Sequence, residues 1–208
     1  MKILLLGNYE NLAQQSMQRF AEMLREGFAA GGHEVRLVRP PIWLGRSLRG
    51  DAGLAKWIGY LDRFVLYPPL LRRQIQWADV VHVCDQANAV YIPHLRGKPH
   101  LITCHDMLAI RAARGEVGAA PTGWSGRIYQ RWILRGLQRA QAVTCVSHQT
   151  AAELQRLGGI PATHISVVPN ALNYPYRPMP AGEAGAHLRA LGLDPAQVFF
   201  VHVGGNQW

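Results

Sequence analysis

MKILLLGNYENLAQQSMQRFAEMLREGFAAGGHEVRLV, residues 1–38, holds one complete strand–helix–strand pattern. Residues 3–6 are a short apolar run of the kind that forms a buried strand. Residues 14–30 follow with apolar side chains at three- and four-residue steps, which predicts an amphipathic helix. The glycine pair at 31 and 32 ends that helix, and a second apolar run begins at Val35. The stretch therefore predicts a βαβ unit.

The same alternation continues along the chain. Near-continuous runs rich in Val, Ile, Leu and Cys predict strands buried on both faces of a parallel sheet. These runs are residues 3–6, 35–38, 80–84, 100–104, 142–146 and 165–168. Residues 124–140 predict another helix, and Ser147 is placed to cap the next one. We expect an α/β domain with a Rossmann-like, doubly wound parallel sheet.

The sequence changes character after residue 168. Residues 169–180 are too proline-rich for a helix or a central strand and indicate a stiff connection. A short helix over residues 183–191 and a buried strand over residues 198–203 are expected beyond it. We therefore expect a first domain over residues 1–170, a linker over 171–182, and the start of a truncated second domain over 183–208.

Composition narrows the class of protein. Apolar residues make up 49% and charged residues 17%, which is typical of a folded globular chain. The net charge of +9 favours an anionic partner: nucleic acid, an anionic membrane or a phosphorylated small molecule. The first apolar run is shorter than the ~7–15 residues of a secretory signal, and no run reaches the ~18 residues of a membrane span. Cys84, Cys104 and Cys145 lie in strand-like runs, as expected of buried, reduced thiols in a cytosolic protein.

Polar residues follow several predicted strands. Ligands of open parallel sheets bind beyond the carboxyl ends of the strands, so these residues are the first site candidates. They are Gly7, Asn8, Tyr9, Asn11, Asp85, Asn88, His105, Asp106, Ser147 and Asn170. His105 can hydrogen-bond a sugar hydroxyl, with Asp106 orienting the ring, or Asp106 can simply cap the next helix. The histidines show no metal-ligand spacing, and we expect no metal.

Residues 43–77 interleave arginines with tryptophans and aliphatic residues, and Pro68-Pro69 is expected to break this segment in its second half. A basic amphipathic helix can lie on an anionic bilayer. The alternative is an ordinary amphipathic helix packed on the domain with its arginines in solvent.

The ordered motifs resemble those of the retaining family-four glycosyltransferases of the GT-B type. They are Gly7 after the first strand, Gly31-Gly32-His33-Glu34-Val35, Thr103-Cys104-His105-Asp106, Val146-Ser147-His148-Gln149-Thr150, Val168-Pro169-Asn170, and Val201-His202-Val203-Gly204-Gly205. The resemblance covers the whole chain in the right order. It implies two Rossmann-like domains facing across a cleft, of which this chain supplies the acceptor side.

The resemblance also implies roles for particular residues. Gly7, Asn8, Gly204 and Gly205 would approach the donor, and His105 with Asp106 would contact the transferred sugar. Tyr9, Asn11, Asp85, Asn88, Ser147 and Asn170 would line the acceptor side of the cleft. The usual second glycine of the first loop is replaced here, and alanine follows Pro169-Asn170 where many relatives have glycine.

The activity that the resemblance implies is metal-independent transfer of a hexose-type sugar with retention at the anomeric carbon. The donor would be a nucleotide-sugar, with no other cofactor, and the acceptor a saccharide or lipid-linked molecule of polysaccharide biosynthesis. We expect the fragment alone to be inactive, and the protein to be cytoplasmic or peripheral at the inner membrane face through residues 43–77. The alternative is a non-catalytic α/β module that binds an anionic ligand or membrane; nucleic acid is not expected as a partner.

Overall fold

The computed structural model describes residues 1–10, 14–44, 53–95, 97–116, 122–172 and 177–201. The chain divides into two compact units, Met1–Ala171 and Leu172–Trp208. The first unit holds the sheet and the candidate site, and the two units are described separately.

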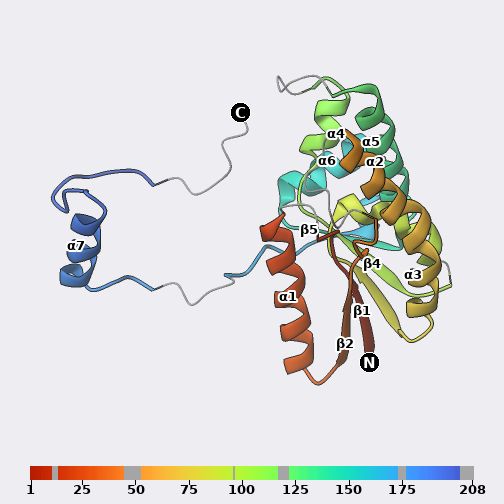
Figure 1. Ribbon diagram of the computed structural model, residues 1–208, viewed down its shortest axis with the longest axis horizontal. Coiled ribbons are helices and arrows are strands. Elements are labelled where there is room, and N and C mark those ends of the chain that lie inside the picture. The colour runs from red at the N-terminus through yellow and green to blue at the C-terminus, as the bar shows by residue number, and fades with distance from the viewer. Residues whose placement is uncertain (11–13, 45–52, 96, 117–121, 173–176, 202–208) are drawn as a thin grey trace. The chain divides into compact units, whose positions relative to one another are not determined.

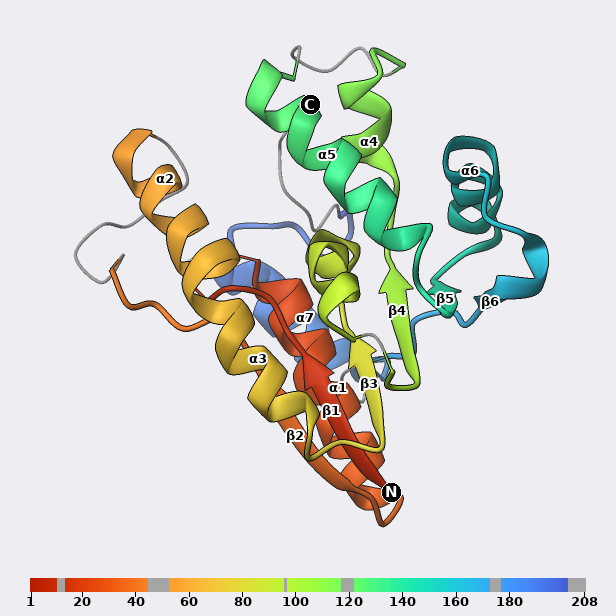
Figure 2. The same ribbon diagram turned by 90° about the vertical axis from the view of Figure 1, so that its right-hand side faces the viewer.

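The first unit is built on a six-stranded parallel sheet with strand order β2-β1-β3-β4-β5-β6 (Figures 1 and 2). The strands are β1 (Lys2–Leu6), β2 (Glu34–Val38), β3 (Val80–Val83), β4 (His100–Cys104), β5 (Ala142–Cys145) and β6 (Ile165–Val167). All five neighbouring pairs are parallel. The predicted Rossmann-like α/β fold is therefore confirmed. The chain leaves β1 toward β2 and returns on its other side to β3, so β1 and β3 flank the point where the winding direction reverses.

One face of the sheet is covered by α1 (Gln15–Ala30), which lies alongside β1 and β2 in Figure 1. Ile3 and Leu5 point to this side and pack with Ala21 of the helix. The helix ends because Gly32 adopts a left-handed backbone angle of φ 79°, which glycine adopts without strain. The chain can then turn directly into β2, as the glycine pair predicted.

The opposite face carries the main core. Leu4 and Leu6, which alternate with Ile3 and Leu5, pack here among the remaining elements of the unit. The core residues come from α3 (Tyr67–Ile75), η3 (Gln86–Leu95), α4 (Leu108–Ala113), α5 (Trp124–Leu137) and α6 (His148–Gly158), whereas η4 (Ala162–His164), between α6 and β6, contributes no buried residue. The closest approach lies between α5 and η3, where a Cβ on Gly136 would overlap the carbonyl group of Ala89.

The Pro68-Pro69 pair does not break the helical segment, contrary to the sequence expectation. Here α2 (Gly53–Leu61) runs through a π-helical turn, η2 (Asp62–Leu66), directly into α3. The prolines occupy the first turn of α3, where a missing backbone N–H is tolerated, and the wider π turn changes the hydrogen-bond register just before them. The idea that all arginines of this segment lie in solvent is also wrong, because Arg63 is buried.

The second unit contains α7 (Ala181–Ala190), near the predicted helix. The predicted strand over residues 198–203 is not formed in its described part, residues 198–201. No described strand pairs with these residues, and Val198 and Phe200 are 95% and 101% exposed. A strand needs a hydrogen-bonded neighbour and a covered face, and the described residues supply neither. Across the described helices of both units, none combines the length and the apolar character needed to cross a bilayer.

Candidate functional site

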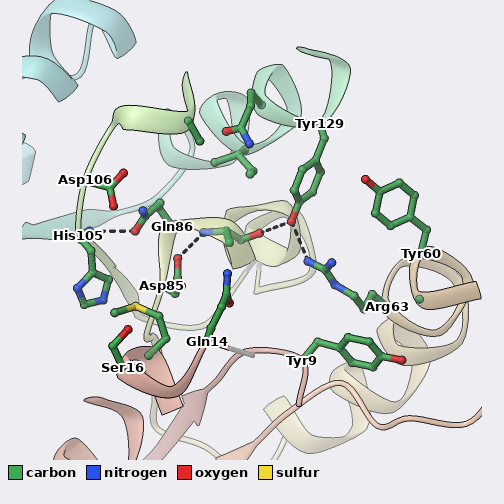
Figure 3. Close-up of a pocket in the computed structure, with 16 residues that line it drawn as sticks. Tyr9, Gln14, Ser16, Tyr60, Arg63, Asp85, Gln86, His105, Asp106 and Tyr129 are labelled. Carbon is green, nitrogen blue, oxygen red and sulfur yellow. Dashed lines mark hydrogen bonds between the residues drawn. The ribbon is translucent and has the colours of Figure 1, made fainter. Parts of the chain in front are cut away.

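A pocket of about 570 Å³ opens at the carboxyl edge of the sheet (Figure 3). The tips of β1, β3 and β4 form its floor, and α1, the α2–η2 segment and α5 supply its walls. Its lining residues are Tyr9, Gln14, Ser16, Met17, Gly59, Tyr60, Arg63, Asp85, Gln86, Ala87, His105, Asp106, Ala109, Tyr129, Gln130 and Ile133. Because β1 and β3 flank the reversal of the winding, this is where open α/β sheets bind ligands.

A buried polar network ties the loop after β1 to the loop after β3. The Asn8 side-chain amide donates to Asp85 Oδ2 at 2.5 Å and to Gln14 Oε1 at 2.7 Å. Its oxygen accepts from Asn88 Nδ2 at 2.6 Å. The other Asp85 oxygen accepts from the Ala87 N–H at 2.7 Å. Of the predicted site residues in this network, Asp85 reaches the pocket, whereas Asn8 and Asn88 support it from behind.

His105 lies at the tip of β4 and lines the pocket. Its Nε2 lies 2.9 Å from the Cys84 carbonyl oxygen, so Nε2 carries the proton and Nδ1 is the accepting nitrogen of the neutral ring. The edge of the ring also packs against Phe20 with ring centroids 4.7 Å apart. The backbone N–H of His105 donates to Gln86 Oε1 at 2.9 Å. The imidazole is therefore held in a fixed orientation at the pocket wall.

The Asp106 and Ser147 side chains each accept a backbone N–H near the start of a helix. Asp106 lines the pocket, and its Oδ1 accepts from the Leu108 N–H at 2.9 Å. The N-cap position of α4 is Met107, one residue later, so Asp106 is not the N-capping residue weighed from the sequence. Ser147 caps α6 by accepting from the Thr150 N–H at 3.1 Å, as predicted. Ser147 does not line the pocket. The Thr150 hydroxyl in turn donates to the His105 carbonyl oxygen at 3.3 Å, so α6 also supports the β4 tip.

The remaining predicted residues lie elsewhere. Gly7 is buried, and its N–H donates to the Val38 carbonyl oxygen at 2.9 Å, so it extends the pairing of β1 with β2. Tyr9 lines the pocket, and Asn170 is exposed beyond β6. Asn11, Gly204 and Gly205 lie outside the described residues.

The opposite end of the pocket from His105 is made of groups that the sequence did not single out (Figure 3). Arg63 is 6% exposed, and its Nη2 donates to the Tyr129 hydroxyl at 2.8 Å. That hydroxyl donates onward to the Ala87 carbonyl oxygen at 3.0 Å. Tyr60 completes this wall. The sequence did carry one signal: the Asp62-Arg63 pair is embedded in an apolar run, where charged side chains become buried only with dedicated partners.

The buried titratable groups near the site are mostly held neutral. Burial lowers the pKa of His82 to about 4, and its Nε2 pairs with the Thr103 hydroxyl at 2.8 Å. Burial likewise raises the pKa of the Cys84 thiol to about 12. All three cysteines are buried free thiols, as predicted. Within the described ranges, no three His, Cys, Asp or Glu side chains gather as a metal site would require.

The fold and the pocket together describe a Rossmann-like domain with a polar pocket at its topological switch point. The chain belongs to Glycosyltransferase Family 4, whose model matches residues 17–174. This membership places it among enzymes of the glycosyltransferase type. No curated protein matches this chain.

One of the solved structures similar to this chain is "Crystal Structure of RosB with bound intermediate OHC-RP (8-demethyl-8-formylriboflavin-5'-phosphate)". The sequences are 15% identical over 99% of this chain and 92% of that chain, with a TM-score of 0.31. A likeness at this level says nothing about the site.

Proposed function

We propose that this chain forms the acceptor side of a retaining, metal-independent glycosyltransferase. The enzyme would move a hexose-type sugar from a nucleotide-sugar to a saccharide or lipid-linked acceptor. The observation that carries the proposal is the convergence of Asp85, His105 and Asp106 on one pocket at the carboxyl edge of the sheet, in a chain of Glycosyltransferase Family 4.

The pocket has the chemistry that a sugar requires. Carboxylate oxygens accept from sugar hydroxyls, and the Gln86 and Gln130 side chains add amide donors and acceptors. The aromatic rings of Tyr60 and Tyr129 provide the apolar surface against which a sugar ring can pack. A pocket of this size holds a hexose with space for a linked group.

His105 would hold a hydroxyl of the transferred sugar. Its Nε2–H is engaged by the Cys84 carbonyl oxygen, so Nδ1 is the atom that would accept the hydroxyl proton in a hydrogen bond. The fixed ring needs no reorientation when the sugar arrives, and such preorganisation lowers the barrier to transfer. Asp106 would accept from a second hydroxyl through Oδ2, since Oδ1 is bonded to the Leu108 N–H.

The donor side of the proposal rests on the family. Positive charge and backbone N–H groups would stabilise the departing nucleoside diphosphate without a metal. Gly7 and Asn8 are candidates to contact the donor, as are Gly204 and Gly205, which lie outside the described residues. The Gly7 N–H already bonds Val38, however, and the side chains of Leu37 and Arg39 lie against its Cα, so this structure leaves Gly7 no open contact for the donor.

The test is a donor screen on the complete protein, following release of the nucleoside diphosphate with and without saccharide acceptors. Release that depends on both one donor and one acceptor supports the proposal. Binding of anionic ligands with no release from any donor would favour the non-catalytic module instead. Adding a chelator should leave the release rate unchanged, and loss of activity on chelation would contradict a metal-independent reaction.

The peripheral membrane location also stays a proposal. Trp57, Leu61 and Val65 follow one another at four-residue steps along α2 and η2, and all three side chains are exposed. Exposed apolar side chains on a chain of net charge +9 suit the surface of an anionic bilayer. Such a location would bring the pocket near a lipid-linked acceptor.

A further inference from the structure

Arg63 is a buried positive charge that forms no ion pair with any described residue. It is 6% exposed, and no carboxylate of the described residues lies within ion-pair distance of its guanidinium. Its Nη2 bonds the Tyr129 hydroxyl, whereas Nε is buried without an acceptor. A buried charge without a counter-ion is strongly destabilising, so its presence here requires an explanation.

Two carboxylates, one adjacent to Arg63 in sequence and one in the same pocket, accept hydrogen bonds from other groups. Asp62, the preceding residue, accepts from the Tyr9 hydroxyl at 3.1 Å and from the backbone N–H groups of Trp43 and Leu44 at 3.2 and 3.1 Å. Asp85 accepts from Asn8 and from the backbone of the following turn. Neither carboxylate lies within ion-pair distance of the Arg63 guanidinium, which lines the pocket.

Aromatic rings hold the guanidinium in place. The Cζ atom of Arg63 lies 4.9 Å from the ring centre of Phe64, 5.7 Å from that of Tyr129 and 5.9 Å from that of Tyr9. Burial alone would lower the pKa of Arg63, but the hydroxyls of Tyr129 and Tyr91 outweigh it and raise that pKa. Arg63 is therefore charged at every physiological pH, and the rings give its planar fork a fixed direction.

We infer that Arg63 binds an anionic group of the acceptor, a carboxylate or a phosphate, at the end of the pocket opposite His105. The acceptor would thus be an acidic or phosphorylated saccharide rather than a neutral one. This inference rests on the proposed function, which identifies the ligand of this pocket as the acceptor. The two ends of the pocket in Figure 3 would then bind different parts of the acceptor. Asp85, His105 and Asp106 would bind sugar hydroxyls, and Arg63 with its tyrosines would bind the anionic group.

The experiment is calorimetric titration of the 208-residue chain with glucose, glucuronate and glucose 6-phosphate at one fixed ionic strength. We expect at least one anionic hexose to bind about tenfold to hundredfold more tightly than glucose, the range of one charge-assisted contact. Glucuronate distinguishes a carboxylate site from the phosphate site that glucose 6-phosphate reports. Arg63→Met should remove the preference for the anionic hexoses over glucose.

The matched control is Arg135→Met, which removes the same charge from an exposed position of α5 outside the pocket. The inference is overturned if no anionic hexose binds better than glucose, or if both variants lose the preference equally. In case Arg63→Met does not fold, the Arg63 Nε–H signal of the wild-type chain gives an independent readout by nitrogen-15 NMR. That signal should shift during titration with the tighter anionic hexose, and an unchanged signal at saturation would also overturn the inference.

The outcomes for this site and for the transfer reaction are separable. An Arg63-dependent anion preference together with no nucleoside diphosphate release would remove the transferase proposal and keep the anion site. Sugar transfer from a nucleotide-sugar to a neutral acceptor, with no preference for anionic hexoses, would keep the transferase proposal and remove the anion site.

Discussion

Replacing Asn8 by alanine tests whether the buried network holds the floor of the pocket. The change removes partners from Asp85 Oδ2, Asn88 Nδ2 and Gln14 Oε1 at once. Asp85 and Asn88 are 4% and 1% exposed, so solvent does not readily replace those two bonds, whereas Gln14 is exposed. Leaving a buried polar group unpaired costs about 1–3 kcal/mol. Two such groups give an expected loss of roughly 2–6 kcal/mol in the free energy of unfolding.

Urea denaturation of the wild-type chain and the Asn8→Ala variant measures this loss directly. A domain of this size should show a fall in Tm of roughly 2–4 °C per kcal/mol, so a thermal melt provides a second check. Gln14→Ala is the matched control, because it removes only the exposed partner, and it should lose less than about 1 kcal/mol. Equal and small losses in the two variants would refute the claim that this network is a structural support.

Three further changes test separate features. Burial lowers the pKa of His82 to about 4, so the folded state resists protonation of this side chain. The free energy of unfolding should therefore be unaffected by His82 above pH ~6.5, and should fall by up to about 1.4 kcal/mol per pH unit between pH ~6.5 and pH ~4. His82→Gln should flatten this part of the pH profile measured by urea denaturation. Gly136→Ala should cost about 1–3 kcal/mol in urea denaturation because the new Cβ overlaps the Ala89 carbonyl, whereas Gly27→Ala in α1, where a Cβ meets open space, should stabilise by up to about 1 kcal/mol. The wild-type chain should float with anionic but not with neutral liposomes, and Trp57→Glu should float less with anionic liposomes. If anionic and neutral liposomes float the wild type and the variant to the same extent, the membrane role proposed for residues 43–77 is contradicted.

Much of the fold was predictable because buried parallel strands leave a strong pattern. Runs such as residues 100–104 are apolar throughout, and the glycine pair before β2 marks the turn. The incorrect predictions concern segments whose structure depends on tertiary contacts rather than on local sequence. The proline pair at residues 68–69 is a helix breaker by local rules, yet the preceding π turn accommodates it. Residues 198–201 have strand composition but no paired neighbour among the described residues.

The site was predictable as far as strand tips can be read from sequence. Tyr9, Asp85, His105 and Asp106 follow three different strands, and the parallel topology brings them to one pocket. Arg63 could not be placed in this way. It comes from a helical segment between strands, and its orientation depends on the π turn that directs it toward Tyr129.

The central claim is that the β4 tip contributes directly to sugar transfer, and the turnover of His105 variants in the complete protein tests it most directly. With the best donor and acceptor, His105→Ala should reduce nucleoside diphosphate release by about two orders of magnitude or more. His105→Gln, whose side-chain amide can still donate to the Cys84 carbonyl oxygen, should retain the wild-type Tm and still lose turnover. Wild-type turnover in both folded variants would contradict the account.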